Sequence, residues 1–403
     1  MNEPTPRVPP DFDPLAPETF DSPYPIYADL RRRCPVAHAD AWNGFWALTR
    51  YEDVRNAASD YRTYTTTVQN VIPKVAFTGR RPPLHLDPPE HTVYRKALNP
   101  LLFPENVARL EPSIRAIARE ILGPLVLAGR GDICKDYSSA LTIRVFAAWM
   151  SLDGADARAL SDIGRAYNIA VQSAQDAIVR DSSLELYKMA RDLIQHRRAA
   201  PRDPAVDPIS ALLAARDHGQ PLNEELLIGT VRQVLVVGII APTIVIGSIA
   251  VHLARDSALQ STLREQPARW PAALEEFLRL YTPYRGFART PTRDVEVGGR
   301  RIDAGEPVAL MYASANRDEN VFAEPDKFIW DRPNIGEHLA FGRGPHNCVG
   351  AALARLELRV ALEELLASTK CFELDGAVVP TRMPEIGALS VPVRLTRCVN
   401  NHE

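Results

Sequence analysis

The hydrophobic pattern of the first ninety residues predicts a short helix, a strand pair and a long loop. A helical pattern begins over residues 25–33, and PVAHADAWNGFWALTRYEDV after it predicts two strands that lead into another helix. Within this stretch GFWALT alternates and carries aromatic residues that favour strands. Residues 60–90 are rich in Thr, Pro and basic side chains, and we expect a long loop over a functional region, because structureless stretches of that length are uncommon elsewhere. We expect residues 1–20 to form an irregular arm.

The pattern is overwhelmingly helical between about 90 and 285. From 286 to 335 it changes to short β-like runs and Pro-rich loops. A final helix is predicted from 348 to about 367, followed by β-like tail segments. With no internal repeat and no change of composition along the chain, we expect a mainly α fold with small β-sheets, in which residues 1–403 form a single domain.

The longest predicted helix starts at Asn223, a good N-cap, and ends near Arg255. At 1.5 Å per residue it would be roughly 50 Å long and would cross the whole domain. Pro242 lies in its middle and should open or kink the turn before it. Residues 234–251 carry no charge, which reaches the lower limit for a transmembrane helix. Because this run contains Pro and Gly and has no second span beside it, we expect a buried central helix and no membrane association.

Composition and charge narrow the class of protein. The chain has 403 residues, of which 46% are hydrophobic and 24% charged, as in ordinary globular proteins. A net charge of -3 argues against a nucleic-acid-binding protein, which would be basic. The five cysteines are widely spaced and form no zinc-type pair, so we expect a cytoplasmic protein without a disulfide framework. The acidic, Pro-rich start has no apolar stretch, and we expect no signal peptide.

The strongest chemical motif is FGRGPHNCVG, from Phe341 to Gly350. Its glycines, Gly342 among them, let the backbone pass closely beneath a flat ligand. Cys348 precedes a helix whose N-terminus favours the thiolate form. A thiolate ligand of haem iron promotes O–O cleavage. The alternative is a buried structural cysteine, which is common for an isolated cysteine but does not account for the whole motif.

With this motif the sequence resembles the cytochrome P450 family, and the resemblance extends over essentially the whole chain. Glu276 and Arg279 match the family's structural Glu-x-x-Arg element, and their spacing places them on one helix face. The resemblance implies a triangular, helix-rich domain that holds haem b (iron protoporphyrin IX) between the central helix and the Cys-loop helix, with Cys348 as the iron ligand. The further haem-binding residues that it implies are Phe341, Gly342, Gly350 and the propionate contacts His91, Arg95, Arg289 and His346.

The predicted oxygen-activation site departs from the family pattern. Most members carry an acid and a Thr over the iron, and alignment on Gly238 puts Ile240 and Ala241 at these positions, followed by Pro242 and Thr243. Thr243 lies two residues too late and on another helix face. A water or the substrate could replace the proton relay, the enzyme could use peroxide or catalyse a coupling or rearrangement that needs less proton delivery, or Thr243 could act after a register shift.

The resemblance also implies a mostly apolar pocket and separate redox partners. The residues expected to line the pocket are Val71, Ile72, Val237, Ile240, Ala241, Ile244, Arg285 and Phe287. The implied reaction is monooxygenation, such as hydroxylation or O-dealkylation, of a small to medium apolar or aromatic molecule. Electrons would come from NAD(P)H through a ferredoxin or flavodoxin bound on the cysteine side, where Arg95, Lys96, Arg343, Arg355 and Arg359 could contribute. A peroxide-driven or oxidative-coupling enzyme and a non-catalytic haem sensor are the alternatives.

Overall fold

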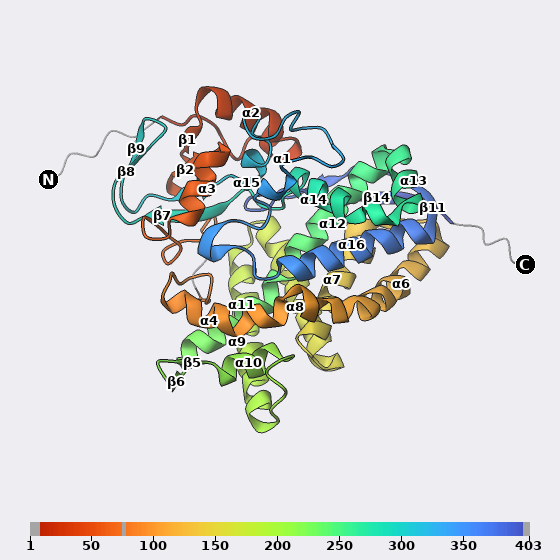
Figure 1. Cartoon of the computed structure of the whole chain (residues 1–403), viewed down its shortest axis with the longest axis horizontal. Helices are drawn as coiled ribbons and strands as arrows, with labels where there is room; N and C mark the ends of the chain where they lie inside the picture. Colours follow the sequence, from red (N-terminus) through yellow and green to blue (C-terminus); the bar gives the residue numbers. More distant parts are fainter. Residues whose placement is uncertain (1–8, 75–77, 398–403) are drawn as a thin grey trace, which may run out of the picture.

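The predicted strand pair forms one edge of the main sheet. In this computed structural model, which describes residues 9–74 and 78–397, β1 (Val36–Ala39) and β2 (Phe45–Leu48) pair antiparallel. The sheet continues in the order β1-β2-β10-β7-β3, with β10 (Val308–Leu310) parallel to β2 and antiparallel to β7 (Phe287–Pro291). The sheet lies at the upper left in Figure 1, beside the N-terminal helices.

The remaining strands form four small sheets. Strands β11, β14 and β4 form a three-stranded sheet, and the pairs β12–β13, β5–β6 and β8–β9 are two-stranded. Their bounds are β4 (Arg130–Asp132), β5 (Arg216–Asp217), β6 (Gln220–Pro221), β8 (Val295–Val297), β9 (Arg300–Ile302), β11 (Thr369–Leu374), β12 (Val379–Pro380), β13 (Ala388–Ser390) and β14 (Pro392–Arg397), and β3 of the main sheet is Tyr64–Thr65.

Helices make up 55% of the chain, so the predicted mainly α fold with small sheets is confirmed. They are α1 (Pro17–Asp21), α2 (Tyr24–Arg33), α3 (Tyr51–Ser59), α4 (Glu90–Leu98), α5 (Pro104–Val107), α6 (Glu111–Ala128), α7 (Ser139–Trp149), α8 (Gly154–Gln172), α9 (Asp176–Ala199), α10 (Pro208–Ala214), α11 (Glu224–Val237), α12 (Ile240–Arg255), α13 (Ser257–Glu265), α14 (Trp270–Leu280), α15 (Tyr312–Ala315) and α16 (Ala351–Ser368). Short helical turns are η1 (Ala41–Asn43), η2 (Asn99–Leu102), η3 (Ala108–Leu110), η4 (Ile133–Ser138), η5 (Pro267–Arg269), η6 (Ile335–Glu337) and η7 (Gly344–His346).

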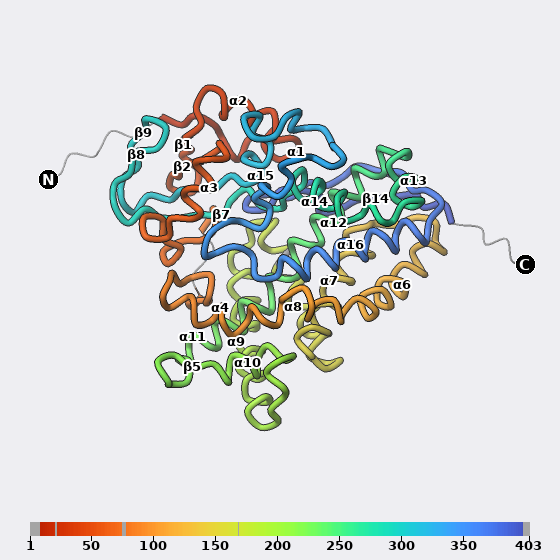
Figure 2. Tube along the Cα trace, in the orientation of Figure 1, coloured from red at the N-terminus to blue at the C-terminus, as the bar shows by residue number. Residues whose placement is uncertain are grey.

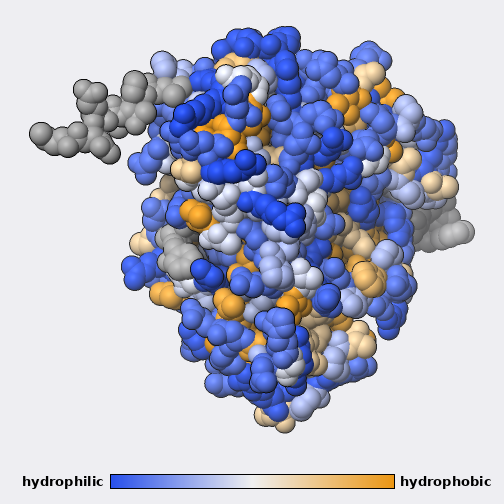
Figure 3. Space-filling model, turned by 60° about the vertical axis from the view of Figure 1, so that its left-hand side comes forward, coloured by the Kyte–Doolittle hydropathy of each residue, from blue (hydrophilic) through white to orange (hydrophobic). Residues whose placement is uncertain are grey.

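The central helix is interrupted instead of continuous. A turn at residues 238–239 separates α11 from α12, directly before Pro242. Pro242 has no N–H to donate to the carbonyl of Gly238, so the predicted opening of the helix before Pro242 is confirmed. Taken together, residues 224–255 are apolar and long enough to cross a membrane, but 72% of their most apolar window is buried inside the protein. The face in Figure 3 is mostly hydrophilic, with apolar residues in scattered groups.

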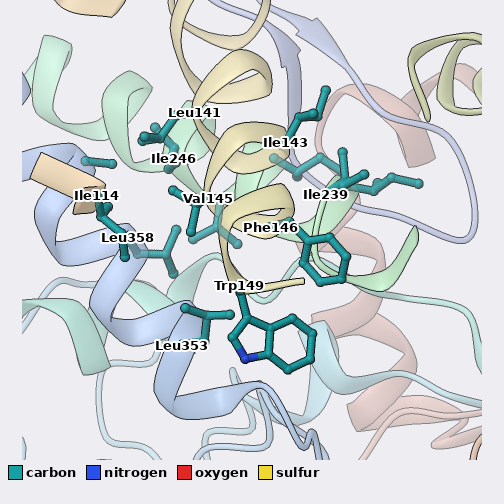
Figure 4. Packing of buried hydrophobic residues seen from close by; sticks show 14 of the residues in the cluster. Ile114, Leu141, Ile143, Val145, Phe146, Trp149, Ile239, Ile246, Leu353 and Leu358 are labelled. Atoms are coloured by element: carbon teal, nitrogen blue, oxygen red, sulfur yellow. The ribbon is translucent and has the colours of Figure 1, made fainter. Parts of the chain in front are cut away.

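The main core lies between α6, α7, α12 and α16. Figure 4 shows Phe146 and Trp149 of α7 near Leu353 of α16 and Ile239 at the helix break. Gly238 is needed in this core, because a Cβ atom there would collide with the Phe146 ring. In the trace of Figure 2, α16 runs from the centre of the molecule toward its right side. The packing thus brings the start of α16, which follows the Cys motif, close to the break in the central helix.

Candidate active site

Cys348 lies at the end of a glycine-containing turn that packs against α3. Gly342 and Gly344 have φ angles of 70° and 71°, in the left-handed region that favours glycine. A Cβ atom on Gly344 would lie 2.7 Å from the carbonyl oxygen of Ala58, so a larger residue would displace the turn from α3. The Cys348 N–H donates to the carbonyl oxygen of Phe341 at 2.7 Å. The glycines therefore fix the path of the backbone that presents the thiol.

The thiol of Cys348 is surrounded by protein and yet accessible to a ligand. Helix α16 begins at Ala351 with Gly350 as its N-cap, three residues later than predicted. Burial raises the pKa of the Cys348 thiol, whereas a hydrogen bond from the backbone of Gly350 and the charges of Arg95 and Arg355 lower it. Burial has the larger effect, so the pKa is raised overall, and the other three groups would stabilise the thiolate once a metal ion displaces its proton.

Two of the four predicted propionate contacts have buried nitrogens without a protein partner. His91, at the start of α4, is 4% exposed, and neither ring nitrogen makes a hydrogen bond. Arg289 on β7 is also 4% exposed; its Nη1 donates to the adjacent Ala288 carbonyl oxygen, but its Nε has no partner. Leaving buried donors unpaired is costly, so these groups indicate a ligand with acceptor atoms. The carboxylates of haem fit this requirement.

The electrostatics of this group favour an acidic ligand. The rings of His91 and His346 lie 4.6 Å apart. Burial, together with the charges of His346 and Arg95, lowers the pKa of His91 to about 4. Burial also lowers the pKa of Arg289. A carboxylate beside these donors would offset the cost of burying them.

The other two predicted contacts, Arg95 and His346, connect the loop before α4 and α4 itself to the Cys turn. The Arg95 guanidinium donates to the backbone oxygen of Asn347 at 2.6 Å and to its Oδ1 at 3.1 Å. His346 Nε2 lies 3.0 Å from Asp87 Oδ1, and Asp87 also accepts from the hydroxyl of Thr65. No role was predicted for Asp87, although it is the first residue of the DPPEH motif that contains His91. Its place at the start of that motif was the available signal.

The predicted oxygen-activation residues lie at the helix break. Ile240 begins α12 and is 8% exposed, and Ala241 is half-buried. Neither side chain can donate or accept a proton. The Thr243 hydroxyl donates to the Ile239 carbonyl oxygen at 2.9 Å and lies 3.1 Å from the Thr142 hydroxyl of α7. These contacts give Thr243 a structural role within the helix packing, and they favour the two hypotheses that do not use its hydroxyl.

The predicted pocket residues occupy three different environments. Val71 and Ile72 run along β7, where Val71 pairs with Phe287 and the Ile72 N–H donates to the Gly286 carbonyl oxygen at 2.7 Å. Ile244 is 1% exposed and packs against the turn at Gly387. Val237, in contrast, is 48% exposed at the end of α11. Ile72, which is also 1% exposed, and Ile244 therefore belong to hydrophobic cores, whereas Val71 and Phe287 are partly exposed.

Arg285 needs a correction. It was expected to line the pocket, but it is 1% exposed and donates to the carbonyl oxygens of Glu385 and Thr381 at 2.8 and 2.9 Å and to that of Thr19. Its donors are thus used by backbone acceptors from both ends of the chain. The contacts give Arg285 a structural role instead.

Glu276 and Arg279 form a buried ion pair that includes a third residue. Arg279 Nε and Nη2 lie 2.8 Å from the two Glu276 oxygens. Arg332 donates to the same carboxylate at 3.0 Å, and Arg279 also donates to the Asn316 carbonyl oxygen. The network ties α14 to the segment before the Cys turn. Arg332 was not predicted to take part, because its only signal in the sequence is a lone basic residue between Asp331 and Pro333.

The arginines proposed for a partner surface have acidic neighbours. Arg343 pairs with Glu337, Arg355 with Glu275, and Arg359 with both Glu111 and Glu363. Hydrogen bonds from Arg355 and His338 outweigh burial and lower the pKa of Glu275 to about 2, so this pair stays charged. Lys96 is exposed without an ion pair in the described part of the chain. Much of the expected positive charge on this side is therefore neutralised locally.

Comparison with known proteins agrees with the fold and the site. The family model described as Cytochrome P450 matches residues 270–397. The chain is 31% identical to "Cytochrome P450 109" of Bacillus spizizenii over 93% of this chain and 92% of that protein. It is 31% identical to linalool 8-monooxygenase of Pseudomonas putida over 88% of this chain and 91% of that protein. The structure of cytochrome P450 CYP109Q5 from Chondromyces apiculatus superposes with a TM-score of 0.87 at 29% identity, covering 96% of this chain and 99% of that one.

A helix-rich fold that presents one cysteine beside unpaired buried donors defines a haem–thiolate protein. The chain belongs to the cytochrome P450 family. It is an oxidoreductase that incorporates oxygen, a monooxygenase of the bacterial type, and membership of the family implies a haem cofactor.

Proposed function

We propose that the enzyme inserts one oxygen atom into a small to medium apolar or aromatic molecule, by hydroxylation or O-dealkylation. The observation that carries this proposal is the set of unpaired buried donors on His91 and Arg289 beside the accessible thiol of Cys348. The relatives named linalool 8-monooxygenase and mycinamicin IV hydroxylase/epoxidase support a small-molecule substrate. The chain, residues 1–403, would act as a single domain in the cytoplasm, with electrons from NAD(P)H through a ferredoxin or flavodoxin.

In this proposal each residue of the site has a defined task. Haem b, when bound, supplies the iron centre at which dioxygen is reduced. Cys348 provides the thiolate ligand, and Phe341, Gly342 and Gly350 shape the turn that presents it. His91 and Arg289 donate to the propionates. Arg95 and His346 hold the Cys turn against the α4 region and complete the positive surroundings of the carboxylates.

The oxygen side would work without a protein hydroxyl. Ile240 and Ala241 exclude water, Pro242 opens the helix, and the Thr243 hydroxyl is held by Ile239 and Thr142. A proton must then come from a bound water or from a polar group of the substrate. This arrangement also supports the second candidate, a peroxide-driven or oxidative-coupling enzyme, because peroxide already carries protons that dioxygen lacks. The names of the relatives do not support the sensor hypothesis.

The two candidates differ in their response to Ala241→Thr. We would measure product and consumed NADPH with ferredoxin and its reductase, and product with hydrogen peroxide alone. If dioxygen is the oxidant, the added hydroxyl raises the fraction of NADPH that yields product and leaves the peroxide reaction unchanged. Efficient peroxide turnover together with no gain from Ala241→Thr would contradict the ferredoxin-dependent proposal. Thr243→Val is the control, and we expect it to leave this fraction unchanged.

A further inference from the structure

Two buried arginines have no acidic partner. Arg81, in the loop before α4, is 8% exposed, and Arg232 in α11 is 1% exposed. Within the described residues, each of the other buried arginines donates to a carboxylate or a backbone carbonyl oxygen, as Arg197 does to Asp207 at 2.9 Å. Arg81 and Arg232 have neither kind of acceptor, and the Nε atoms of both lack any hydrogen-bond partner. Unpaired buried guanidinium groups indicate a missing anion.

The side chains in contact with the two arginines are neutral, and they include Gln233, whose Oε1 accepts from Arg232 Nη1 at 3.4 Å. Arg232 Nη2 donates to the Ser183 hydroxyl at 2.8 Å, and its guanidinium carbon lies 5.6 and 5.8 Å from the ring centroids of Tyr167 and Tyr187. Arg81 Nη2 lies 3.3 Å from His85 Nε2. Burial and the charges of the two arginines lower the pKa of His85 to about 3, so this ring is uncharged at neutral pH. The positive charges therefore lack a counterion.

The loop carrying Arg81 is held close to α11 by a specific glycine. A Cβ atom on Gly229 would collide with the carbonyl oxygen of Arg80, so only glycine permits this approach. Gly229 and Arg232 lie three residues apart and therefore on the same face of α11. The Tyr187 hydroxyl also donates to the Arg80 carbonyl oxygen at 3.4 Å. The fold thus brings the two like charges together, and burial and the charge of Arg232 lower the pKa of Arg81.

A carboxylate would satisfy both guanidinium groups at once. Charge-assisted, bidentate hydrogen bonds from Arg are the strongest that proteins make to carboxylates. An unpaired buried charge destabilises a protein, so a carboxylate that completes an ion pair with these buried guanidinium groups would bind favourably. The site also lies close in sequence to the proposed oxygen site, because Arg232 belongs to α11 and Ile240 begins α12 directly after the helix break.

We propose that Arg81 and Arg232 bind the carboxylate of the substrate, so that the enzyme oxidises an organic acid at the end far from its carboxylate. This inference rests on the oxygenase function proposed above and narrows its substrate class. Because Arg232 lies in α11 and the proposed oxygen site begins at α12, we expect acids whose reacting carbon lies at the end far from the carboxylate. Para-substituted aryl acids and medium-chain fatty acids meet this condition, whereas ortho-substituted aryl acids do not.

Matched pairs of ligands test the inference by absorption titration of the ferric holoenzyme. The pairs are 4-ethylbenzoate with 4-ethylbenzamide and dodecanoate with dodecanamide, and 2-ethylbenzoate is the geometric control. We expect at least one acid to bind about 10- to 100-fold more tightly than its amide. Arg81→Leu and Arg232→Leu should remove this preference without weakening the amide, and Arg81→Lys should restore part of it. Equal affinity for acid and amide in both pairs would overturn the inference.

The titration and the oxidation assay together distinguish a failure of carboxylate binding at Arg81 and Arg232 from a failure of the proposed oxygenase function. Tight binding of the benzoate or of the dodecanoate identifies the acid class. Acid binding without oxidation, either with ferredoxin and its reductase or with hydrogen peroxide, would contradict the proposed function and leave the assignment of Arg81 and Arg232 as a carboxylate site intact. Oxidation of neutral molecules with no preference for acids would contradict the inference alone.

Thermal unfolding of the ligand-free holoenzyme distinguishes a ligand-binding role of Arg81 from a structural one. Arg81→Leu removes a buried charge that has no counterion, so we expect an unchanged or higher Tm. The matched variant Arg197→Leu leaves the fully buried Asp207 unpaired and should lower the Tm. If Arg81→Leu lowers the Tm as much as Arg197→Leu, Arg81 is structural and the inference is wrong.

Discussion

Glu276→Leu tests the buried network that holds α14 to the segment before the Cys turn. Glu276 is 1% exposed and accepts hydrogen bonds from Arg279, Arg332 and the Ile329 N–H. Removing it leaves two buried guanidinium groups without their carboxylate. Breaking such a network typically costs about 3–5 kcal/mol.

The expected change in Tm follows from the size of the chain. An unfolding entropy of about 2.1 cal/mol/K per residue means that, for 403 residues, about 0.8 kcal/mol corresponds to 1 °C. Glu276→Leu should therefore lower the Tm by about 4–6 °C, measured by circular dichroism at a fixed heating rate. Arg301→Ala is the control, because its ion pairs with Asp294 and Asp303 are largely exposed, and it should leave the Tm unchanged. Equal effects of the two variants would refute the reasoning.

Three further substitutions have defined outcomes. Gly238→Ala should lower the free energy of unfolding by about 1–3 kcal/mol in chemical denaturation, since its Cβ collides with Phe146; adding Phe146→Leu should recover part of the loss, and additive losses would contradict the clash. Gly344→Ala should weaken haem retention in dialysis, because its Cβ would press on α3; unchanged retention would argue against a role in shaping the turn. Burial raises the pKa of Glu357 well above its usual value, so the carboxyl ionises more readily in the unfolded chain than in the folded protein. The free energy of unfolding therefore falls as the pH rises above the pKa that this group has in the unfolded chain. Glu357→Gln should accordingly raise the Tm more at about pH 8 than at about pH 5, and a gain independent of pH would contradict that sign.

Local sequence features predicted most of the fold and the centre of the site. The alternating aromatic segment became β2 and the run after it α3, because a strand and an amphipathic helix can be recognised from periods of two and 3.6 residues. The Cys motif could be interpreted as a ligand-binding turn because its glycines adopt backbone conformations that few other residues allow. Pro242 predicted the break in the central helix through its missing N–H.

Interactions between distant segments could not be predicted from local patterns. Arg285 was expected in the pocket, but its acceptors are backbone oxygens, which carry no side-chain signal. Arg332 joins Glu276 from 56 residues away, and Arg81 meets Arg232 only because Gly229 admits the loop. In a helix Thr243 could have faced either the iron or α7, and only the packing around Thr142 decides between them.

The central claim is that Cys348 binds haem iron as a thiolate. The most direct measurement is the absorption spectrum of the carbon-monoxide complex of the reduced protein, recorded for the wild type and for Cys348→His, with haem content measured in both. We expect the thiolate-type band that gives the family its name in the wild type, and its replacement by a histidine-type band in the variant. A wild-type spectrum without the thiolate band, or a thiolate band that persists in Cys348→His, would show that Cys348 is not the iron ligand.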